Sequence, residues 1–343
     1  MIALIQRAVI CVLLAIVCVH YVESYTLPVV EKIRKTLFGE QAYMRAKEGC
    51  AAIQGDEWVH PATLSLTAYG TAQRHLGDAY GLHEPEVLQD YAAAPSTDAD
   101  LRCIADFLLH VAPVERRGGL PVRAFRYDIP KSSYGIESGW YSGLAQSFAG
   151  QILLAAHVRF EDPVYLEAAI EVGNLLRVEI GDGGVKIPLA DGAIWFEEYA
   201  QSGKTPPMVL NGHLLALDYL YWLGRADPAG PWLALFDAGI KSVVGEIDTY
   251  AGRAWSYYDA LGNLANHKYQ RFHIRQLRRY SSHDQSGTLG SAGDAMSRQL
   301  WIPAGILQRL ATQPSRLILF LVGCFSLMIF SMWTGIRLWV TRR

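Results

Sequence analysis

The 343-residue chain lacks the motifs of several common enzyme classes. It contains no G-x-S-x-G, no phosphate-binding P-loop and no H-E-x-x-H. The net charge is only -2, so no overall field would recruit nucleic acid. Cysteine is scarce, with five residues, and their spacing resembles no metal site. These absences argue against serine hydrolases, P-loop enzymes, zincins and nucleic-acid-binding proteins.

The composition is that of a folded protein with apolar ends. Hydrophobic residues make up 51% of the chain, aromatic residues 11% and charged residues 19%, which excludes a disordered chain. The length suffices for one large domain or two small ones. The mean hydropathy of +0.11 is high for a soluble enzyme, and the two terminal segments account for it.

The C-terminal segment has the length and composition of a membrane span. Residues 317–336 carry no charge, and 20 helical residues match a hydrocarbon core of roughly 30 Å. Trp333 and Trp339 are typical of the interfacial belt. We therefore predict a C-terminal transmembrane helix over residues 317–340.

The N-terminal apolar run at residues 8–22 is shorter and lacks an Ala-x-Ala-like cleavage site. It predicts a membrane anchor or signal-anchor within residues 1–24. Cys50 and Cys103 are the two cysteines outside the apolar ends, and they either pair in an oxidising compartment or remain buried thiols. We expect a membrane-anchored protein whose catalytic domain is extracytoplasmic, that is periplasmic or lumenal.

The middle of the chain, residues 30–280, has helical periodicity. The apolar spacing predicts helices over residues 101–112, 144–160, 164–176, 208–223, 232–247 and 265–280. Short β-like pieces are expected at residues 123–129, 184–189 and 254–258. The fold class is therefore mostly α, an α/α-toroid-like incomplete barrel of helical hairpins with short β-hairpins, flanked by terminal transmembrane helices. Residues 281–312 are expected to form a polar linker and an amphipathic helix.

The first cluster whose residue types could support binding or catalysis spans residues 138–146 (SGWYSGLAQ). Such loops can bind pyranose rings on their aromatic faces, which makes Trp140, Tyr141 and Gln146 candidate substrate-binding residues. A structural turn around a packed tryptophan is the equally weighted alternative.

The second cluster pairs Glu197 and Glu198 with neighbouring aromatics, Trp195 and Tyr199. Paired carboxylates suit general acid/base chemistry, although neighbouring residues of a strand face opposite sides, so that only one would face a cleft. A solvated acidic pair is the alternative. The following 211–213 segment (Asn-Gly-His) begins a predicted helix whose N–H groups could hold a carboxylate, or is a plain helix start.

The third cluster joins residues 255–259 to a basic run at residues 267–279. Arg271, Arg275 and Arg279 are spaced i, i+4, i+8 and share one helical face. This spacing predicts a local polyanion-binding patch, with a solvated face held by salt bridges as the alternative.

Together, these clusters resemble the C-terminal domain of D-glucuronyl C5-epimerases over about residues 138–280. The segments that carry the resemblance are WYSGLAQ at 140–146, GV at 184–185, WFEEY at 195–199, VLNG at 209–212, LFDAG at 235–239, YD at 258–259, and Tyr269 with HIRQL at 273–277. The resemblance implies an α/α-toroid-like domain that converts D-glucuronate to L-iduronate residues within a polysaccharide.

The family motifs map by position onto Tyr258, Tyr269, Glu198 and Tyr199 as catalytic residues. Where the animal family has an arginine, this chain has Leu261, so another cation must neutralise charge; Arg271 and Arg253 are candidates. The expected substrate-binding residues are Trp140, Tyr141, Gln146, Trp195, Asn211, His213, Arg271, His273 and Arg275. Proton removal and return at C5 needs no redox cofactor, and no metal ligand set is evident.

The expected partners are an acidic, glucuronate-containing polysaccharide and the membrane, without nucleic acid; a homodimer is allowed. A uronate polysaccharide lyase removes the same proton and then expels the C4 oxygen. A glycoside hydrolase would need a second carboxyl such as Asp259 or Glu137. A membrane-anchored glycan-binding protein without catalysis is the remaining alternative.

Overall fold

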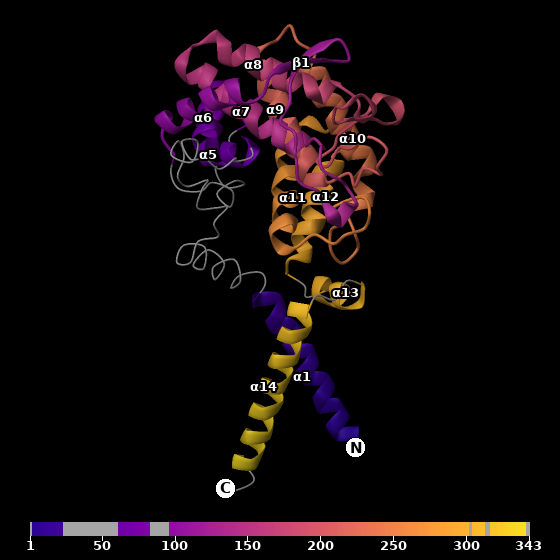
Figure 1. The fold of residues 1–343 in the computed structure, drawn as a ribbon. Helices are drawn as coiled ribbons and strands as arrows, with labels where there is room; N and C mark the ends of the chain where they lie inside the picture. Colours follow the sequence, from indigo (N-terminus) through magenta and orange to yellow (C-terminus); the bar gives the residue numbers. More distant parts are fainter. Residues whose placement is uncertain (1, 23–60, 83–95, 302–303, 313–315, 341–343) are drawn as a thin grey trace.

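The computed structural model describes residues 2–22, 61–82, 96–301, 304–312 and 316–340. Helices dominate these residues, together with two short antiparallel sheets, which confirms a mostly helical chain. A helical body occupies one end of the molecule, and α1 and α14 project from it together (Figure 1). The toroidal arrangement of hairpins stays a prediction.

Six helices of the body lie where the apolar periodicity predicted them: α6 Asp98–Val111, α7 Gly143–Phe160, α8 Pro163–Gly173, α9 Leu210–Ala226, α10 Trp232–Tyr250 and α11 His267–Tyr280. Two further helices, α5 Pro61–Tyr80 and α12 Thr288–Gln299, were not predicted. Side-chain caps fix several starts: the Ser142 hydroxyl accepts from Ala145 N, and the Asn266 amide oxygen accepts from Tyr269 N. The Asp162 side chain caps α8 by accepting a hydrogen bond from Val164 N. Pro163 suits the first position of α8, because an N–H group there would have no partner within the helix.

The core forms around α7 and α9, which are buried over most of their lengths. A helix that is apolar on all sides must be covered on all sides, and α5, α8, α9 and the loops do so for α7. Gly150 is the point of closest approach, because a Cβ there would lie 2.2 Å from Tyr219 Cζ. One continuous hydrophobic core thus links α5 to α12.

Within the described residues, the β-strands form two antiparallel pairs, and isolated bridges join some of the loops. β1 Val114–Arg117 pairs with β2 Leu120–Arg123, and β3 Lys186–Pro188 pairs with β4 Ile194–Phe196. Of the stretch expected at 254–258, only one bridge forms, between Tyr257 and Leu264. Short 3-10 turns lie at Ser132–Tyr134, Asn174–Arg177, Ile180–Asp182, Ala190–Gly192 and Ser281–His283. Much of the remaining loop structure is therefore irregular.

The polar stretch expected to be a linker is instead ordered secondary structure. After the turn at Ser281–His283, α12 packs on α11 through Leu289, Ala292, Gly293 and Met296. Asp284 accepts hydrogen bonds from Ser286 N at 2.9 Å and Leu289 N at 2.8 Å, which fixes the start of the helix. The predicted amphipathic helix at 295–312 is split into the end of α12 and α13 Ala304–Thr312. The many small residues of α12 are typical of a flexible linker, which explains the prediction.

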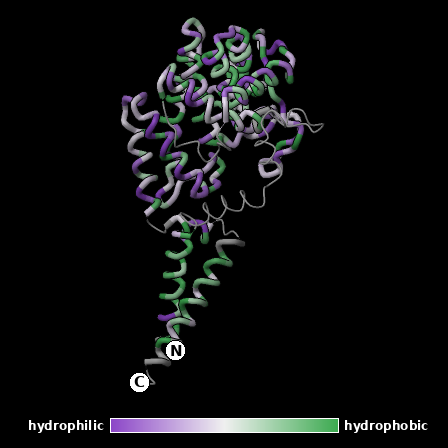
Figure 2. Tube along the Cα trace, turned by 90° about the vertical axis from the view of Figure 1, so that its left-hand side faces the viewer, coloured by the Kyte–Doolittle hydropathy of each residue, from purple (hydrophilic) through white to green (hydrophobic). Residues whose placement is uncertain are grey.

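α1 Ile2–Tyr21, α13 and α14 Arg316–Val340 pack together around Ile16, Val19 and Ile306. Figure 2 shows the projecting helices as largely hydrophobic. Within the described residues, only α1 is long and apolar enough for a membrane span, so it can act as an anchor or a signal sequence. The apolar part of α14 described here is residues 319–334, and its membrane insertion stays a prediction.

The cysteines divide as the sequence suggested. Cys11, Cys18 and Cys324 are free thiols of α1 and α14. Cys103 on α6 is disulfide-bonded. Cys50, for which pairing with Cys103 was one of two alternatives, lies outside the described residues.

Candidate functional site

Three tyrosines that lie far apart in the sequence come together at one place. The rings of Tyr258 and Tyr269 have centroids 4.6 Å apart. The Tyr258 hydroxyl is a hydrogen-bonding neighbour of Tyr199. All three side chains are half-buried, so a ligand can reach them. The structure thus brings together the three tyrosines expected to be catalytic.

The loop that carries Tyr258 is tightened around a buried carboxylate. Asp259 accepts hydrogen bonds from Leu261 N and Asn263 N, each at 3.1 Å, and from the Tyr134 hydroxyl at 2.6 Å. The backbone of Tyr258 is fixed from the other side, since its carbonyl accepts from Leu210 N at 3.2 Å. Asp259 therefore organises the loop, which argues against a catalytic role as a hydrolase carboxyl.

Tyr269 occupies the first turn of α11. Asn266 is the N-cap, and its side chain accepts from Tyr269 N at 2.9 Å. The N-terminus of a helix carries a partial positive charge, which favours negative charge nearby. The fold therefore places one catalytic candidate where a developing anion is stabilised.

Glu197 and Glu198 face different surroundings, as expected of neighbours in an extended segment. Glu197 accepts hydrogen bonds from Tyr199 N at 2.9 Å and Met208 N at 2.8 Å. Glu198 is 5% exposed, and its Oε2 has no hydrogen-bond partner. Both carboxylates are buried, so they do not form a solvated acidic pair. Glu197 holds the loop, while Glu198 is left with an uncommitted oxygen beside Tyr199.

Burial sets the proton affinities of these groups. It raises the pKa of Glu198 to about 7, with Tyr199 hydrogen bonding and the Lys131 charge acting in the opposite direction. Burial also raises the pKa values of Tyr199 and Tyr258, and the Glu198 charge raises them further. Burial raises the pKa of Glu197 to about 7 as well, so at neutral pH the site holds neutral tyrosines and two carboxylates close to their titration points.

An aromatic wall borders the cluster. Trp140 stacks on Tyr127 with ring centroids 4.1 Å apart, and its Nε1 donates to Ile129 O at 2.8 Å. The Tyr199 ring lies 5.3 Å from Trp140 and 5.1 Å from Tyr134. Trp140, a predicted substrate-binding residue, is thus beside the tyrosines. Its 5% exposure makes it chiefly a support for the wall.

Several other predicted substrate-binding residues lie in the core. Trp195 is fully buried and stacks on His213 with ring centroids 4.1 Å apart. His213 Nδ1 accepts from Phe196 N at 2.9 Å, and burial lowers the His213 pKa to about 3. Gln146 accepts from Phe125 N at 2.8 Å and donates to Arg123 O at 3.0 Å. These bonds tie neighbouring backbone segments together.

Asn211 and His273 are buried with polar atoms left unpaired. Asn211 Oδ1 and both ring nitrogens of His273 have no hydrogen-bond partner. Burial lowers the pKa of His273 to about 3, so its ring is neutral. Asn211 lies close to Glu198, because a Cβ on the next residue, Gly212, would sit 2.4 Å from Glu198 Oε2. His273 lies one helical turn after Tyr269.

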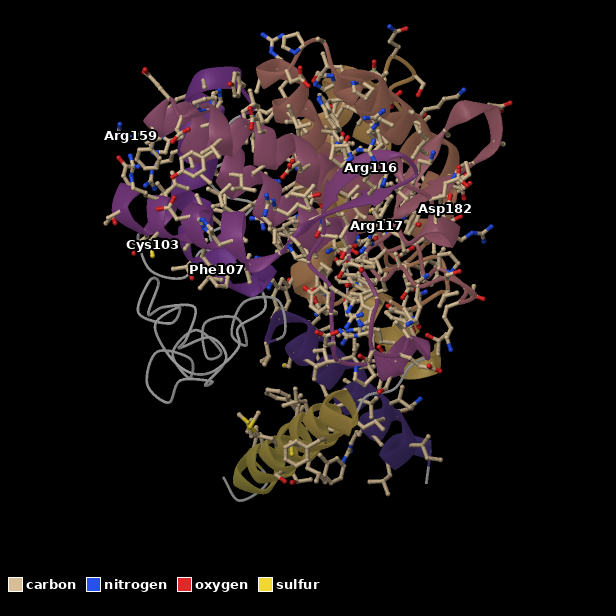
Figure 3. All side chains as sticks on the ribbon, turned by 45° about the horizontal axis from the view of Figure 1, so that its top comes forward. Cys103, Phe107, Arg116, Arg117, Arg159 and Asp182 are labelled. Carbon is tan, nitrogen blue, oxygen red and sulfur yellow. The ribbon has the colours of Figure 1, made fainter. Side chains whose placement is uncertain are left out.

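Two other predicted substrate-binding residues, Tyr141 and Arg271, interact with groups outside the tyrosine cluster. Tyr141 accepts a hydrogen bond from Arg117 Nη2 at 2.6 Å, and Arg117 also donates to Gly183 O at 2.7 Å. Figure 3 shows Arg117 on its hairpin with Asp182 at the adjacent turn. The Arg271 charge acts on His267, which is on the other side of α11 from Tyr269.

The predicted arginine patch is not an open face. Arg279 forms a buried ion pair with Asp218 at 3.3 Å, and its side chain is only 3% exposed. Arg271 and Arg275 are half-buried. The i, i+4, i+8 spacing was a correct description of the helix, but the last arginine is directed into the body because Asp218 on α9 lies there.

Two contributors were missed from the sequence, Lys131 and Tyr134. The Lys131 ammonium lies 4.7 Å from the centre of the Tyr199 ring, and Tyr134 reaches Asp259. The aromatic residues just upstream of Trp140 were the available signal. Among the residues described, no group of three or more His, Cys, Asp or Glu side chains is arranged to hold a metal ion.

Comparison with known proteins identifies relatives of this chain. The family model described as D-glucuronyl C5-epimerase C-terminus matches residues 118–291, which include all four predicted catalytic residues. An uncharacterized protein of Methanocaldococcus jannaschii is 31% identical over 156 residues, 45% of this chain and 50% of that protein. The D-glucuronyl C5-epimerase of Caenorhabditis elegans is 28% identical over 197 residues, 52% of this chain and 31% of that enzyme. The matches thus span half or less of these relatives.

Proposed function

Because the chain belongs to the D-glucuronyl C5-epimerase C-terminus family, we propose that it is an isomerase that inverts C5 of D-glucuronate residues to L-iduronate within an acidic polysaccharide. The observation that carries this proposal is the convergence of Glu198 with Tyr199, Tyr258 and Tyr269. Epimerisation needs a proton acceptor and a proton donor around one carbon. The cluster contains groups suited to each task.

Glu198 is the proposed base. Its pKa of about 7 leaves a substantial ionised fraction at neutral pH, and an ideal catalytic base has a pKa near the working pH. Its unpaired Oε2 is available for the C5 proton. The carboxylate takes that proton, and the electron pair left on C5 delocalises into the substrate carboxylate as an enediolate.

A tyrosine is the proposed acid. The raised pKa values of Tyr199 and Tyr258 keep their hydroxyls protonated, so each can donate rather than accept. A proton delivered to the opposite face of C5 completes the inversion, and the site regains its starting state after proton exchange. Tyr269 is equally placed to donate or to stabilise the enediolate, because it lies at the α11 N-terminus.

The polymer and the setting are part of the proposal. The half-buried tyrosines suit access by an acidic polysaccharide. α1, with α14 as a proposed second span, would hold the domain at a membrane with its catalytic face outside the cytoplasm.

The test is C5 proton exchange. The full chain in detergent, incubated with a glucuronate-containing polysaccharide in deuterated water, should produce deuterium at C5 and iduronate signals by NMR. Tyr258→Phe and Tyr269→Phe should abolish the iduronate signals, because inversion needs a proton donor on the opposite face of C5. Tyr165→Phe is the matched control, because this tyrosine bonds Asp106 on the far helices.

The same spectra separate the alternatives. Unsaturated uronate ends would identify a lyase instead. Absence of C5 exchange across several uronate polymers would refute the epimerase.

A further inference from the structure

We propose that Lys131 binds the carboxylate of the uronate that the site inverts, an inference that rests on the proposed function. Removing a proton next to a carboxylate adds negative charge to a group that is already an anion. A catalyst must supply a positive group at that point, since the charge is otherwise too unstable in a partly buried site. The question is which cation of this chain lies there.

The structure places Lys131 against the catalytic cluster. Its ammonium lies 4.7 Å from the centre of the Tyr199 ring, and its charge acts on Glu198. The side chain is half-buried, and within the described residues it forms no ion pair. Among the residues that the structure describes, no carboxylate lies at ion-pair distance from Lys131, so its ammonium is available to a substrate anion beside the Tyr199 ring.

The backbone around Lys131 is well fixed. Lys131 N donates to Ile136 O at 2.8 Å, and Lys131 O accepts from Tyr134 N at 3.0 Å. Tyr134, on the same turn, reaches Asp259 and packs on Tyr199. The turn is thus tied to the Tyr258 loop, so the lysine is positioned relative to the tyrosines.

Other cations near the site are committed to other partners. Arg117 binds Glu115, Gly183 and Tyr141. Lys204 pairs with Glu137 at 3.4 Å. Leu261, at the position where the resembling family has arginine, is apolar and 54% exposed. The Arg271 charge acts on His267, on the other side of α11 from Tyr269, whereas the Lys131 ammonium lies against the Tyr199 ring; Lys131 is therefore our choice for the charge-neutralising role.

The expected binding mode follows from these positions. The Lys131 ammonium would donate to the substrate carboxylate, with the Tyr199 ring beside it, and the C5 hydrogen would face Glu198. The same contact would strengthen as charge moves onto the carboxylate during proton removal. It predicts recognition of a uronate and not of the corresponding neutral sugar.

The test compares two ligands and two proteins. Binding of a glucuronate oligosaccharide and of its carboxyl-reduced counterpart is measured by calorimetry with the wild type and Lys131→Met. We expect Lys131→Met to weaken binding of the uronate roughly tenfold or more, as for loss of a hydrogen bond to a charged group, and to leave the reduced ligand unaffected. Equal weakening of both ligands, or none, would overturn the assignment.

Further variants separate charge from folding. Lys204→Met, which removes a lysine paired with Glu137, should behave as the wild type with both ligands. Lys131→Arg should keep most of the uronate preference. Wild-type protein that binds the uronate through Lys131 without exchanging C5 deuterium would refute the epimerase and retain this site, so the two proposals fail separately.

Discussion

The rings of Tyr258 and Tyr269 lie 4.6 Å apart at a tilt of 55°, although one belongs to an irregular loop and the other to the first turn of α11. Asp259 holds the loop, and Asn266 caps the helix. The pair is therefore set by two independent polar anchors. A substitution in either anchor should disturb the distance between the tyrosines.

Glu198→Gln should remove catalysis while preserving the fold. Glutamine cannot accept the C5 proton, so C5 exchange should fall by about 10² to 10⁴. Stability should be unchanged or higher, since the variant removes a buried carboxylate with an unpaired oxygen. NMR exchange and thermal unfolding measure the two effects, and retained exchange would exclude Glu198 as the base.

The neighbouring Glu197→Gln should lower the stability of the fold, in contrast to Glu198→Gln. Its carboxylate accepts two backbone N–H bonds, and an amide would place an N–H group against one of these donors. The expected cost is about 1 to 3 kcal/mol of unfolding free energy. Denaturant unfolding at neutral pH provides the measurement; a loss smaller than that of Glu198→Gln would contradict this division of roles.

The pH dependence should follow Glu198 ionisation. Because its pKa is raised to about 7, the basic form increases as pH rises through 7, and the C5 exchange rate should rise with it. The same raised pKa works against stability: the folded state binds protons that the unfolded state has lost, so stability should decline from about pH 4.5 towards 7. Rate profiles from pH 5 to 9 test the first effect. A flat profile across pH 7 would be inconsistent with this base.

Gly212→Ala should displace the Glu198 carboxylate, the proposed base. A Cβ there would lie 2.4 Å from Glu198 Oε2 and 2.7 Å from Glu198 Cβ, so the side chain must move. C5 exchange should fall at least tenfold, because small misplacements of catalytic groups are costly. Gly245→Ala on α10 is the control, since nothing lies within 4 Å of its Cβ position. Equal activity of the two variants would argue against close packing at Glu198.

The docking of α13 should support the Tyr258 loop. Gly305 lies against Trp255, where a Cβ would sit 2.3 Å from the ring, and Gln308 contacts the Tyr257 hydroxyl. Gly305→Leu should therefore separate α13 from this loop, lowering both the melting temperature and the C5 exchange rate. Gly323→Leu on α14, whose Cβ position is open, is the matched variant. Unchanged exchange in Gly305→Leu would mean that the helices only anchor the domain.

The sequence was most informative where chemistry depends on residue type and order. The order of the aromatic and acidic clusters was enough to select Glu198, Tyr199, Tyr258 and Tyr269, which the structure brings together. It could not identify Lys131, because this residue precedes a short 3-10 turn that has no periodicity, and it is far in sequence from Glu198 and Tyr258.

Burial explains the other differences. Trp195 and His213 have the residue types of a sugar site, yet they stack in the core, a choice that depends on long-range packing. The glycines and serines of α12 are typical of a linker, but in the structure its small residues pack closely against α11. Neither outcome can be obtained from local pattern alone.

α1 and α14 pack on each other, and the first residues of α1 and the last residues of α14 lie at the end of the molecule opposite the body (Figure 1). If both helices cross a bilayer, fluorescent reporters fused to the two ends will be located in the same compartment. A protease that removes one reporter will then reach the other as well. Opposite results at the two ends would mean that only one of the two helices crosses the bilayer.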